Sequence, residues 1–564
     1  MPDSDAVKHL SDVLRVDEIL AILLVQRGIK NLEEAQNFFR PAYDLLHSPM
    51  LMKDMQRAVD RIDHAIKNRE KIMVYGDYDV DGTTSVAMVY SFLKKIHPSV
   101  DYYIPDRYTE GYGISLKGID VAVAGNYKLI ISLDCGIKSV EKIKYASSKG
   151  IDFIVCDHHY PGDELPNTFA VLNPKRHDCN YPYKELSGCG VGFKMLQAYA
   201  LRNNIPMEEV YEYIDLVAVS IASDIVPMDG ENRVLASLGI KKLNDNPGLG
   251  LKHVVKVSGL EDSQRHVDDI VFKIGPRINA AGRMKSGIHA VELLISDDER
   301  VAKQASSEID CYNNDRKNID SDITRQALRM LASDPEDEFR KTTVLFDPSW
   351  HKGVVGIVAS RLIETYYRPT IVLTESNGVA TGSARSVEGF DLYRAIDACS
   401  DLLENFGGHM YAAGLTMKTE NVPIFSKKFE EIVANTITEE QLVANIEIDT
   451  EISFTDITPK FVRNLKQFRP FGPQNMTPVF LTRNVLDTGA GKIVGKYGEH
   501  LKLDLKQESA PNLIFPAIGF QLGEYYQTIR SGKPFDVCYS VEENTFKGET
   551  KTQLQLRGIK VGVA

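Results

Sequence analysis

Three aspartates alternate along residues 75–82, which read Tyr-Gly-Asp-Tyr-Asp-Val-Asp-Gly. Asp77, Asp79 and Asp81 follow the apolar run 72–74, which is typical of a buried strand. In an extended chain every second side chain points to the same side, so the three carboxylates would crowd together. Like charges this close repel one another, and carboxylate oxygens are ligands that suit Mg²⁺ and Mn²⁺. The pattern therefore indicates a metal site; the alternative is a solvated acidic turn, because Asp and Gly are common in turns.

Three later apolar segments also end in side chains that can bind a metal ion. Residues 129–133, 151–156 and 216–223 are followed by Asp134, by Asp157-His158-His159 and by Asp224. In parallel α/β sheets, ligands gather beyond the carboxyl ends of the strands. Four such endings predict one shared site. Carboxylates beside neutral imidazole suit a pair of Mn²⁺ or Mg²⁺ ions, as used in in-line phosphoryl displacement.

In this order the four motifs resemble those of the DHH phosphoesterases, which hydrolyse phosphate esters or anhydrides with two metal ions. The resemblance implies that Asp79 and Asp224 bind one ion and that Asp81 and His158 bind the other. It further implies that Asp134 bridges the two ions, and it makes Asp134, Asp157, His159 and His409 the candidate catalytic residues, with His159 facing the substrate phosphate.

One position departs from the family pattern. Many members carry a histidine two residues before the first aspartate of the motif, where this chain has Tyr75. A phenol, with an ordinary pKa of about 10, is a poor ligand near neutral pH. The Gly-Asp-Tyr-Asp pattern of the RecJ subgroup implies that Asp77 takes over the role, so Asp77 joins the predicted metal ligands.

Two further segments are candidates for contact with phosphate. Residues 275–285 place two arginines and a lysine on an expected glycine-punctuated loop, whose alternative is a merely solvated basic loop. Arg277, Asn279 and Arg283 are its candidate substrate-binding residues. The glycines at 407 and 408 would let His409 approach a phosphate, although a lone histidine is often structural. The spacing to Gly414 resembles the phosphate-contacting signature of the DHH-associated domain, which implies that His409 touches substrate.

Five more segments narrow the resemblance to the RecJ family over nearly the whole chain. They are residues 105–113, 275–284, 350–361, 382–386 and 471–475. The resemblance implies a two-metal 5′→3′ exonuclease that acts on single-stranded DNA, releases 5′-mononucleotides and serves DNA repair and recombination. It also implies a cap for the terminal phosphate made by Arg107, Ser383 and Arg385. Single-stranded DNA is the expected partner of a monomer, and a single-strand-binding protein and a helicase are further candidate partners.

Composition bounds the chain as an ordinary globular protein. Its 564 residues are too many for one core, and 43% are hydrophobic and 26% charged. Seven cysteines, without a Cys-x-x-Cys pair, indicate reduced thiols and a cytoplasmic setting. The N-terminal residues lack a secretory pattern, and we expect no membrane span. The net charge of −12 disfavours nucleic-acid binding unless bound metal offsets it locally.

The pattern of elements predicts an α/β fold with two α/β lobes, a long helical connector and a C-terminal β-barrel of the OB type. The expected units are residues 1–50 (a helical extension packed on the next domain), 51–230 (the DHH domain), 231–338 (helices and connector), 339–440 (the DHH-associated domain) and 445–564 (the OB-fold). Strands are expected at 72–75, 100–104, 129–134, 151–156 and 169–172, and in the barrel at 446–448, 478–481, 501–505 and 535–539. OB-folds commonly grip single strands.

Two other functions fit parts of the pattern. A phosphodiesterase of the same fold that acts on oligoribonucleotides or cyclic dinucleotides would not need the barrel. An inactive scaffold resembling Cdc45 would have lost site carboxylates, whereas this chain keeps every motif position except the one at Tyr75.

Overall fold

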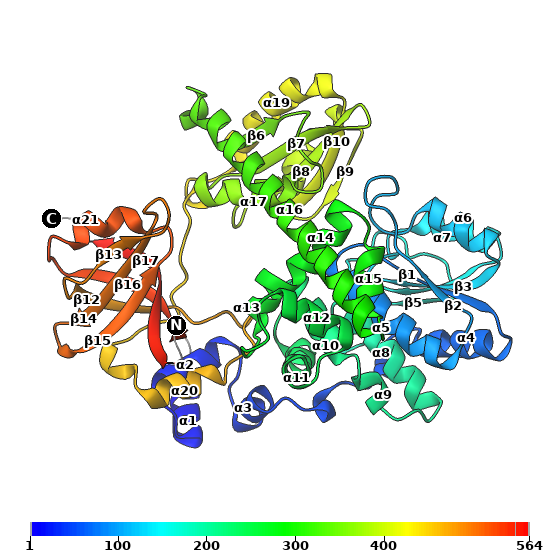
Figure 1. Ribbon diagram of the computed structural model, residues 1–564, viewed down its shortest axis with the longest axis horizontal. Coiled ribbons are helices and arrows are strands. Elements are labelled where there is room, and N and C mark those ends of the chain that lie inside the picture. Colours follow the sequence, from blue (N-terminus) through cyan, green and yellow to red (C-terminus); the bar gives the residue numbers. More distant parts are fainter. Residues whose placement is uncertain (1–2, 547–548, 562–564) are drawn as a thin grey trace.

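The computed structural model describes residues 3–546 and 549–561. Figure 1 shows a first α/β lobe on the right, a second lobe above and a barrel on the left, arranged around a central group of helices. This is the predicted fold class, including the long connector helix and the C-terminal barrel.

The first lobe is built on a parallel five-stranded sheet in the order β2-β1-β3-β4-β5. Its strands are β1 (Lys71–Gly76), β2 (Val100–Tyr103), β3 (Tyr127–Leu133), β4 (Asp152–Cys156) and β5 (Ala170–Leu172). Its helices are α4 (Met55–Lys67), α5 (Val80–Ile96), α6 (Leu116–Ala124), α7 (Val140–Ser148) and α8 (Gly188–Arg202). Along β1, Ile72 and Val74 enter one apolar core and Met73 and Tyr75 enter another, so the strand is apolar throughout because both faces are covered.

A group of helices follows the first lobe. They are α9 (Glu208–Tyr211), α10 (Ile214–Ser223), α11 (Gly230–Asp245), α12 (Leu249–Val257), α13 (Val267–Asp269), the π-helical turn η3 (Ile270–Ile274), α14 (Gly275–Met284), α15 (Ile288–Leu294) and the connector α16 (Glu299–Ala332). The apolar segment 216–223 lies on α10, so Asp224 directly follows a helix.

The prediction of a loop at residues 275–285 is wrong, because these residues form α14. Pro276 lies in the first helical turn, where its missing N–H is not needed. Gly282 serves close packing instead of a turn: an added Cβ there would lie 2.6 Å from the carbonyl oxygen of Tyr78. Gly282 thus lets α14 pack closely against the loop that carries Asp77 and Asp79.

The second lobe has a mixed sheet in the order β6-β7-β8-β10-β9, in which only β6 and β7 pair in parallel. Its elements are β6 (Thr343–Phe346), α17 (Val355–Thr365), β7 (Thr370–Ser376), β8 (Val379–Arg385), α18 (Leu392–Asp397), β9 (Asn405–Gly408), β10 (Ala412–Met417) and α19 (Val422–Thr436). Ser383 and Arg385 lie on β8, and His409 follows β9 at the turn of a hairpin.

The C-terminal sheet runs β11-β12-β16-β17-β15-β14-β13 and closes into a barrel through the β12–β14 pairing. Its elements are β11 (Thr450–Glu451), α20 (Pro459–Lys466), β12 (Phe480–Asp487), β13 (Lys492–Val494), β14 (His500–Gln507), β15 (Ala510–Gly519), α21 (Tyr526–Ile529), β16 (Phe535–Phe546) and β17 (Glu549–Val561). The prediction of a strand at 446–448 is wrong. Ile446 and Ile448 are exposed, at 44% and 43%, in the segment that leads from the second lobe to the barrel.

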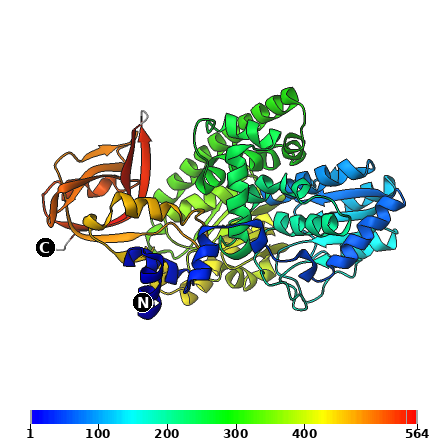
Figure 2. The ribbon, with the colours of Figure 1, turned by 90° about the horizontal axis from the view of Figure 1, so that it is seen from below.

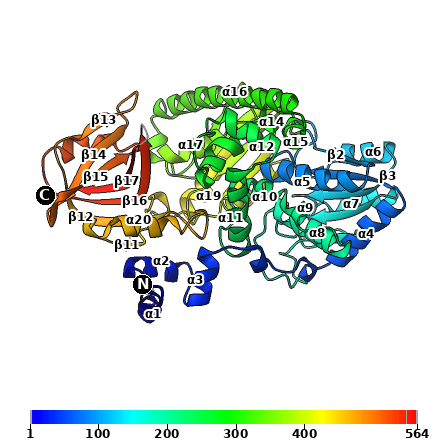
Figure 3. The same ribbon diagram turned by 60° about the horizontal axis from the view of Figure 1, so that its bottom comes forward.

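The N-terminal helices α1 (Ser4–Leu14), α2 (Glu18–Gln26) and α3 (Leu32–Phe39) pack on the barrel, so the expectation that they cover the next domain is wrong. Leu20 and Leu24 share one apolar core with Phe461, Leu465 and Phe468. Figures 2 and 3 show α1–α3 below the barrel and beside α20. An apolar helix face predicts that the helix is buried on that side, but it does not predict which surface covers it. We call α1–α3, α20, the barrel and residues 467–479, which join α20 to β12, together the barrel unit.

Among the described residues, no helix combines the length and apolar character needed to cross a membrane.

This packing predicts how the chain can be shortened. A chain of residues 1–440 should expose Leu20 and Leu24 and bind a hydrophobic dye, since each leucine taken from its core costs roughly 1.5–3 kcal/mol. A chain of residues 42–440 removes both partners, keeps the Tyr43 ring stacked on Tyr211, and should melt cooperatively without dye binding. Dye fluorescence and thermal melting of the two chains check this. Equal dye binding would contradict the shared core.

Candidate metal centre

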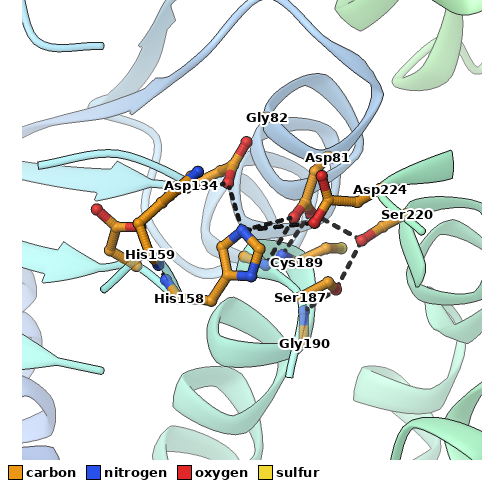
Figure 4. Close-up of polar contacts among 12 residues, drawn as sticks. Asp81, Gly82, Asp134, His158, His159, Ser187, Cys189, Gly190, Ser220 and Asp224 are labelled. Carbon is orange, nitrogen blue, oxygen red and sulfur yellow. Dashed lines mark hydrogen bonds and ion pairs between the residues drawn. The ribbon is translucent and has the colours of Figure 1, made fainter. Parts of the chain in front are cut away.

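The predicted metal ligands meet at the carboxyl end of the first sheet, next to the point where the strand order reverses between β1 and β3. The loop after β1 carries Asp77 and Asp79, the first turn of α5 carries Asp81, and Asp134 follows β3. Figure 4 shows Asp81, Asp134, His158 and Asp224 directed toward one another. The fold thus gathers residues that are up to 147 positions apart, from 77 to 224.

His158 lies at the middle of this group. Its Nε2 atom is 3.2 Å from Oδ1 of Asp134, 3.5 Å from Oδ2 of Asp224 and 3.8 Å from Oδ2 of Asp81. Burial lowers the pKa of His158 to about 4, so at neutral pH its imidazole is neutral, the state that binds a metal ion.

The ligand atoms form two overlapping groups, Asp81–His158–Asp224 and Asp134–His158–His159. His158 is common to both groups. Asp224 lies with Asp81 and His158, whereas the family resemblance paired it with Asp79. Which ligands serve which ion stays a prediction.

Four carboxyl groups of the site are harder to ionise than usual. Burial, followed by the negative charge of neighbouring carboxylates, raises the pKa of Asp77, Asp79, Asp134 and Asp224. Both carboxylate oxygens of Asp77, Oδ1 of Asp134 and both ring nitrogens of His158 are buried without a hydrogen bond to any described residue. Buried oxygen and imidazole atoms without partners, in one negatively charged group, fit divalent cations.

Asp81 is held by the start of α8. Its carboxylate accepts hydrogen bonds from the backbone N–H groups of Gly188 and Cys189, both at 2.7 Å, and from the Ser220 hydroxyl at 2.7 Å. The N-terminus of a helix stabilises an anion through its free N–H groups. Ser187 caps this helix through Gly190. Sequence reasoning missed this support, although a serine and glycines before an apolar run are a helix-start signal.

Asp157 positions His159 instead of facing the shared space. Its carboxylate accepts hydrogen bonds from the backbone N–H groups of Ile137 and His158 and lies 2.8 Å from Nδ1 of His159. Burial alone would raise the pKa of Asp157, but the His159 hydrogen bond and charge hold it well below its ordinary value. Asp157 therefore acts through His159, and its predicted catalytic role is that of a positioning residue.

Two tyrosines border the site in different ways. The Tyr112 hydroxyl lies 3.1 Å from the carbonyl oxygen of Asp134 and 3.2 Å from Nε2 of His159, a contact that sequence reasoning did not single out. The Tyr75 hydroxyl instead donates to the carbonyl of Gly113 at 3.0 Å, and burial raises its pKa. This agrees with leaving Tyr75 out of the metal ligands.

Across from the metal ligands, arginines from both lobes converge. Burial, followed by the charges of Arg107, Arg316 and Arg385, lowers the pKa of Arg283 to about 9. Burial and the charge of Arg107 likewise lower the pKa of Arg385. Guanidinium groups that destabilise one another's charge favour a bound anion.

The first turn of α17 completes this cluster. Arg385 donates to the Ser383 hydroxyl at 2.7 Å. A Cβ on Gly356 would lie 3.0 Å from the hydroxyl oxygen of Ser383 and 3.1 Å from NH2 of Arg385, so the helix start lies directly on them. A helix N-terminus adds its positive end to the two side chains. The structure thus brings together Arg107, Arg283, Ser383 and Arg385.

The remaining candidate substrate-binding residues, Arg277, Asn279 and His409, lie outside this arginine cluster. Arg277 is paired with Asp310 of α16 at 2.8 Å and donates to the carbonyl of Lys273 at 2.9 Å, so the structure turns its charge toward the connector. Asn279 is half-buried on α14, and its role stays a prediction. His409 is largely exposed at the hairpin turn, and partial burial, followed by the positive charge of Lys138, lowers its pKa.

Comparisons with known proteins match this architecture. Family models described as "DHH family, N-terminal domain", "DHHA1 domain" and "RecJ OB domain" match residues 71–221, 340–435 and 448–558. The single-stranded-DNA-specific exonuclease RecJ of Bacillus subtilis is 38% identical over 99% of this chain and 70% of that protein. The protein of the same name from Escherichia coli is 30% identical over 96% of this chain and 95% of that protein. The chain belongs to the RecJ family.

Solved structures of RecJ agree with the fold. The crystal structure of RecJ from Thermus thermophilus in complex with Mn²⁺ has a TM-score of 0.85 at 26% identity and covers 100% of this chain and 79% of that one. A structure of exonuclease RecJ bound to manganese has a TM-score of 0.61 at 32% identity and covers 71% of this chain and 98% of that one. The domain boundaries and the individual site residues stay predictions.

Gly188 and Gly190 provide a matched test of the metal centre. A Cβ on Gly188 would lie 2.6 Å from Cβ of Asp134, whereas one on Gly190 would make ordinary contact at 3.4 Å with Leu186. Gly188→Ala should therefore displace Asp134 and lower the turnover by roughly 100-fold, as a displacement of about 1 Å can. It should also weaken Mn²⁺ binding measured by calorimetry. Gly190→Ala should behave like the wild type; equal behaviour of both variants would remove this contact from the site.

Proposed function

We propose that this chain is a metal-dependent exonuclease that removes 5′-mononucleotides from the 5′ end of single-stranded DNA in DNA repair and recombination. The observation that carries the proposal is the pairing of two centres of opposite charge. Buried carboxylates gather with His158 at the end of the first sheet, and Arg107 and Arg283 gather with Arg385 next to the start of α17. A strand whose end phosphate is held by the arginines can reach the metal centre with its first phosphodiester. The name shared by the relatives, single-stranded-DNA-specific exonuclease, supports the same reading.

The donor set fits two divalent cations, Mn²⁺ or Mg²⁺, as in the Thermus thermophilus RecJ complexes with Mn²⁺ and Mg²⁺. When bound, the cations supply Lewis acidity toward the phosphodiester and a water molecule. Asp77, Asp79, Asp81, Asp134, His158 and Asp224 are the residues that would hold them.

Other side chains of the chain hold the substrate phosphate. His159, oriented by Asp157 through Nδ1, presents its opposite ring edge beside Tyr112. A positioned imidazole can donate to a phosphate oxygen and stabilise the charge that develops in the transition state. His409 approaches from the second lobe on a hairpin. Its neighbour Gly408 has φ +155°, and a Cβ there would lie 2.3 Å from the carbonyl oxygen of Ala412. The glycine thus lets the hairpin turn tightly at the substrate.

The arginine cluster explains why the 5′ end would be selected. A terminal phosphate monoester carries close to two negative charges at neutral pH, more than an internal phosphodiester. Arg107, Arg283 and Arg385 with the start of α17 suit such a dianion. An end held in this way stops the strand from sliding past the metal centre, so cleavage begins at the first bond.

The barrel supplies the affinity for longer strands in this proposal, since OB-folds bind single strands through cationic grooves and stacked bases. A single-strand-binding protein and a helicase are proposed partners that would deliver such strands to a monomeric enzyme. We also propose a cytoplasmic location, because the cysteines are all free thiols.

Replacing the central ligand Asp134 tests the metal mechanism. Asp134→Ala should abolish hydrolysis in Mn²⁺ and in Mg²⁺, as should addition of EDTA to the wild type. DNA binding should survive, because phosphate contacts elsewhere supply much of the affinity. Digestion of 5′- and 3′-labelled oligonucleotides measures both cleavage and polarity. Near wild-type turnover of the variant in Mn²⁺ would remove Asp134 from the site, and release of label from the 3′ end first would overturn the polarity.

Arg385 tests the recognition of the 5′ end. Arg385→Ala removes one charge-assisted contact, worth on the order of 1.5–3 kcal/mol, and should lower the preference for 5′-phosphate over 5′-hydroxyl ends by at least tenfold. Arg394→Ala is the control, because it removes an arginine of the same lobe that is 86% exposed. Competition between the two substrates gives the preference directly. An unchanged ratio in Arg385→Ala would place the end pocket elsewhere.

A further inference from the structure

A buried arginine joins the catalytic part of the molecule to the barrel unit. Arg233 lies on α11 with 4% of its surface exposed. Its guanidinium donates to the carbonyl oxygens of Phe38 (3.1 Å), Phe468 (3.0 Å), Arg469 (3.0 Å) and Pro470 (3.2 Å). The Phe38 ring lies 3.6 Å from the centre of the guanidinium. Each of these partners belongs to the barrel unit.

The receiving segment, residues 468–475, is itself held rigidly. The amide nitrogen of Asn475 donates to the carbonyls of Phe468 (2.9 Å) and Pro470 (2.7 Å), and its amide oxygen accepts from Nε of Arg27 at 2.7 Å. Gly472 and Asn475 exchange backbone hydrogen bonds of 3.0 and 2.9 Å. Carbonyls fixed in this way present a preformed socket for a planar guanidinium. The receiving segment includes the motif at residues 471–475, which the proposed function leaves without a role.

The same segment also contacts the chain that leaves the metal centre. The backbone N–H of Met228, four residues after Asp224, donates to the carbonyl of Pro473 at 2.7 Å. A Cβ on Gly472 would lie 3.1 Å from Cβ of Met228, so the two backbones are in close contact. Residues 468–475 are therefore bound from α11 on one side and from the segment after Asp224 on the other.

We propose that Arg233 is a positioning residue that holds the barrel unit at a set distance from the metal centre, so that one strand occupies both at once. The inference rests on the proposed function, in which the barrel grips the strand that the metal centre cuts. Two sites on one strand reinforce each other most strongly when their separation matches the span of the strand, because the second contact is then made at the highest effective concentration. Lysine could not replace the arginine fully, since an ammonium has three donors and no planar fork.

The test compares Arg233→Met and Arg233→Lys with Arg265→Met. Arg265 is a matched control: it is 8% exposed, and its guanidinium donates to the carbonyls of Leu243, Asn244, Leu260 and Glu261, outside the barrel unit. The measured quantity is kcat/KM on a long single strand divided by kcat/KM on a trinucleotide. Small-angle X-ray scattering reports the spread of distances between the barrel unit and the rest.

Arg233→Met should lower this ratio by about tenfold through KM on the long strand, with kcat on the trinucleotide unchanged. Its scattering should show a broadened distance distribution, and Arg233→Lys should lie between it and the wild type. Arg265→Met should lose thermal stability and keep the wild-type ratio and scattering. If Arg233→Met does not fold, Arg233→Lys decides by the same ratio.

The outcomes separate the two proposals. An unchanged ratio in the folded Arg233 variants, or an equal fall in Arg265→Met, would overturn the positioning role. A wild-type enzyme that shows no advantage for the long strand would instead overturn the proposed role of the barrel.

Discussion

Mutual repulsion among buried carboxylates is the constraint on which the rest of this structure depends. Asp81, Asp134 and Asp224 lie around the imidazole of His158 at the end of a sheet, and Asp77 and Asp79 lie on the adjoining loop. Burial raises the pKa of Asp77, Asp79, Asp134 and Asp224. The fold relieves part of this locally. Asp81 accepts hydrogen bonds from the first N–H group of α8 and from the Ser220 hydroxyl. The nearby Asp157 is hydrogen-bonded to His159. Asp79 accepts the backbone N–H of Gly82 at 2.9 Å, and Asp134 and Asp224 lie beside His158. Cations would offset the remaining repulsion, so metal binding and folding stability are coupled.

Positive charges gather between the two lobes. Burial, followed by the charge of Arg107, lowers the pKa of both Arg283 and Arg385, and the start of α17 adds to the positive field. In the proposed function one strand contacts both centres: the arginines hold its terminal phosphate, and its first phosphodiester lies at the carboxylates. The net charge of −12 is no obstacle, because a local field decides where a strand binds.

Specific contacts hold the two lobes and the barrel unit in place relative to one another. The connector α16 and the contact of Arg283 with the carbonyl of Gly353, at 3.0 Å, join the two lobes. Arg233 and Met228 join the catalytic part to the barrel unit. Buried polar contacts of this kind add orientation more than energy, because an unmade hydrogen bond in a dry interface is costly in any other arrangement.

Short-range patterns in the sequence predict the strands and the edge at which their ligands meet. Apolar runs ending in Asp77, Asp134 and Asp157 predicted the parallel strands and the edge at which their ligands meet, because strand period and chain direction are local properties. The motifs carried the family resemblance as well.

Which surfaces pack against each other depends on contacts between residues far apart in the sequence. Helical and turn uses of glycine look alike in sequence, so residues 275–285 were expected as a loop, whereas packing on Tyr78 requires a helix there. Arg277 and Arg283 lie in one motif. Arg277 forms an ion pair with Asp310 of the connector, whereas Arg283 donates to the carbonyl of Gly353 in the second lobe. The N-terminal helices pack on a barrel that is more than 400 residues away along the chain. The apolar stripe of a helix predicts that this face is buried, but it does not predict which surface covers it.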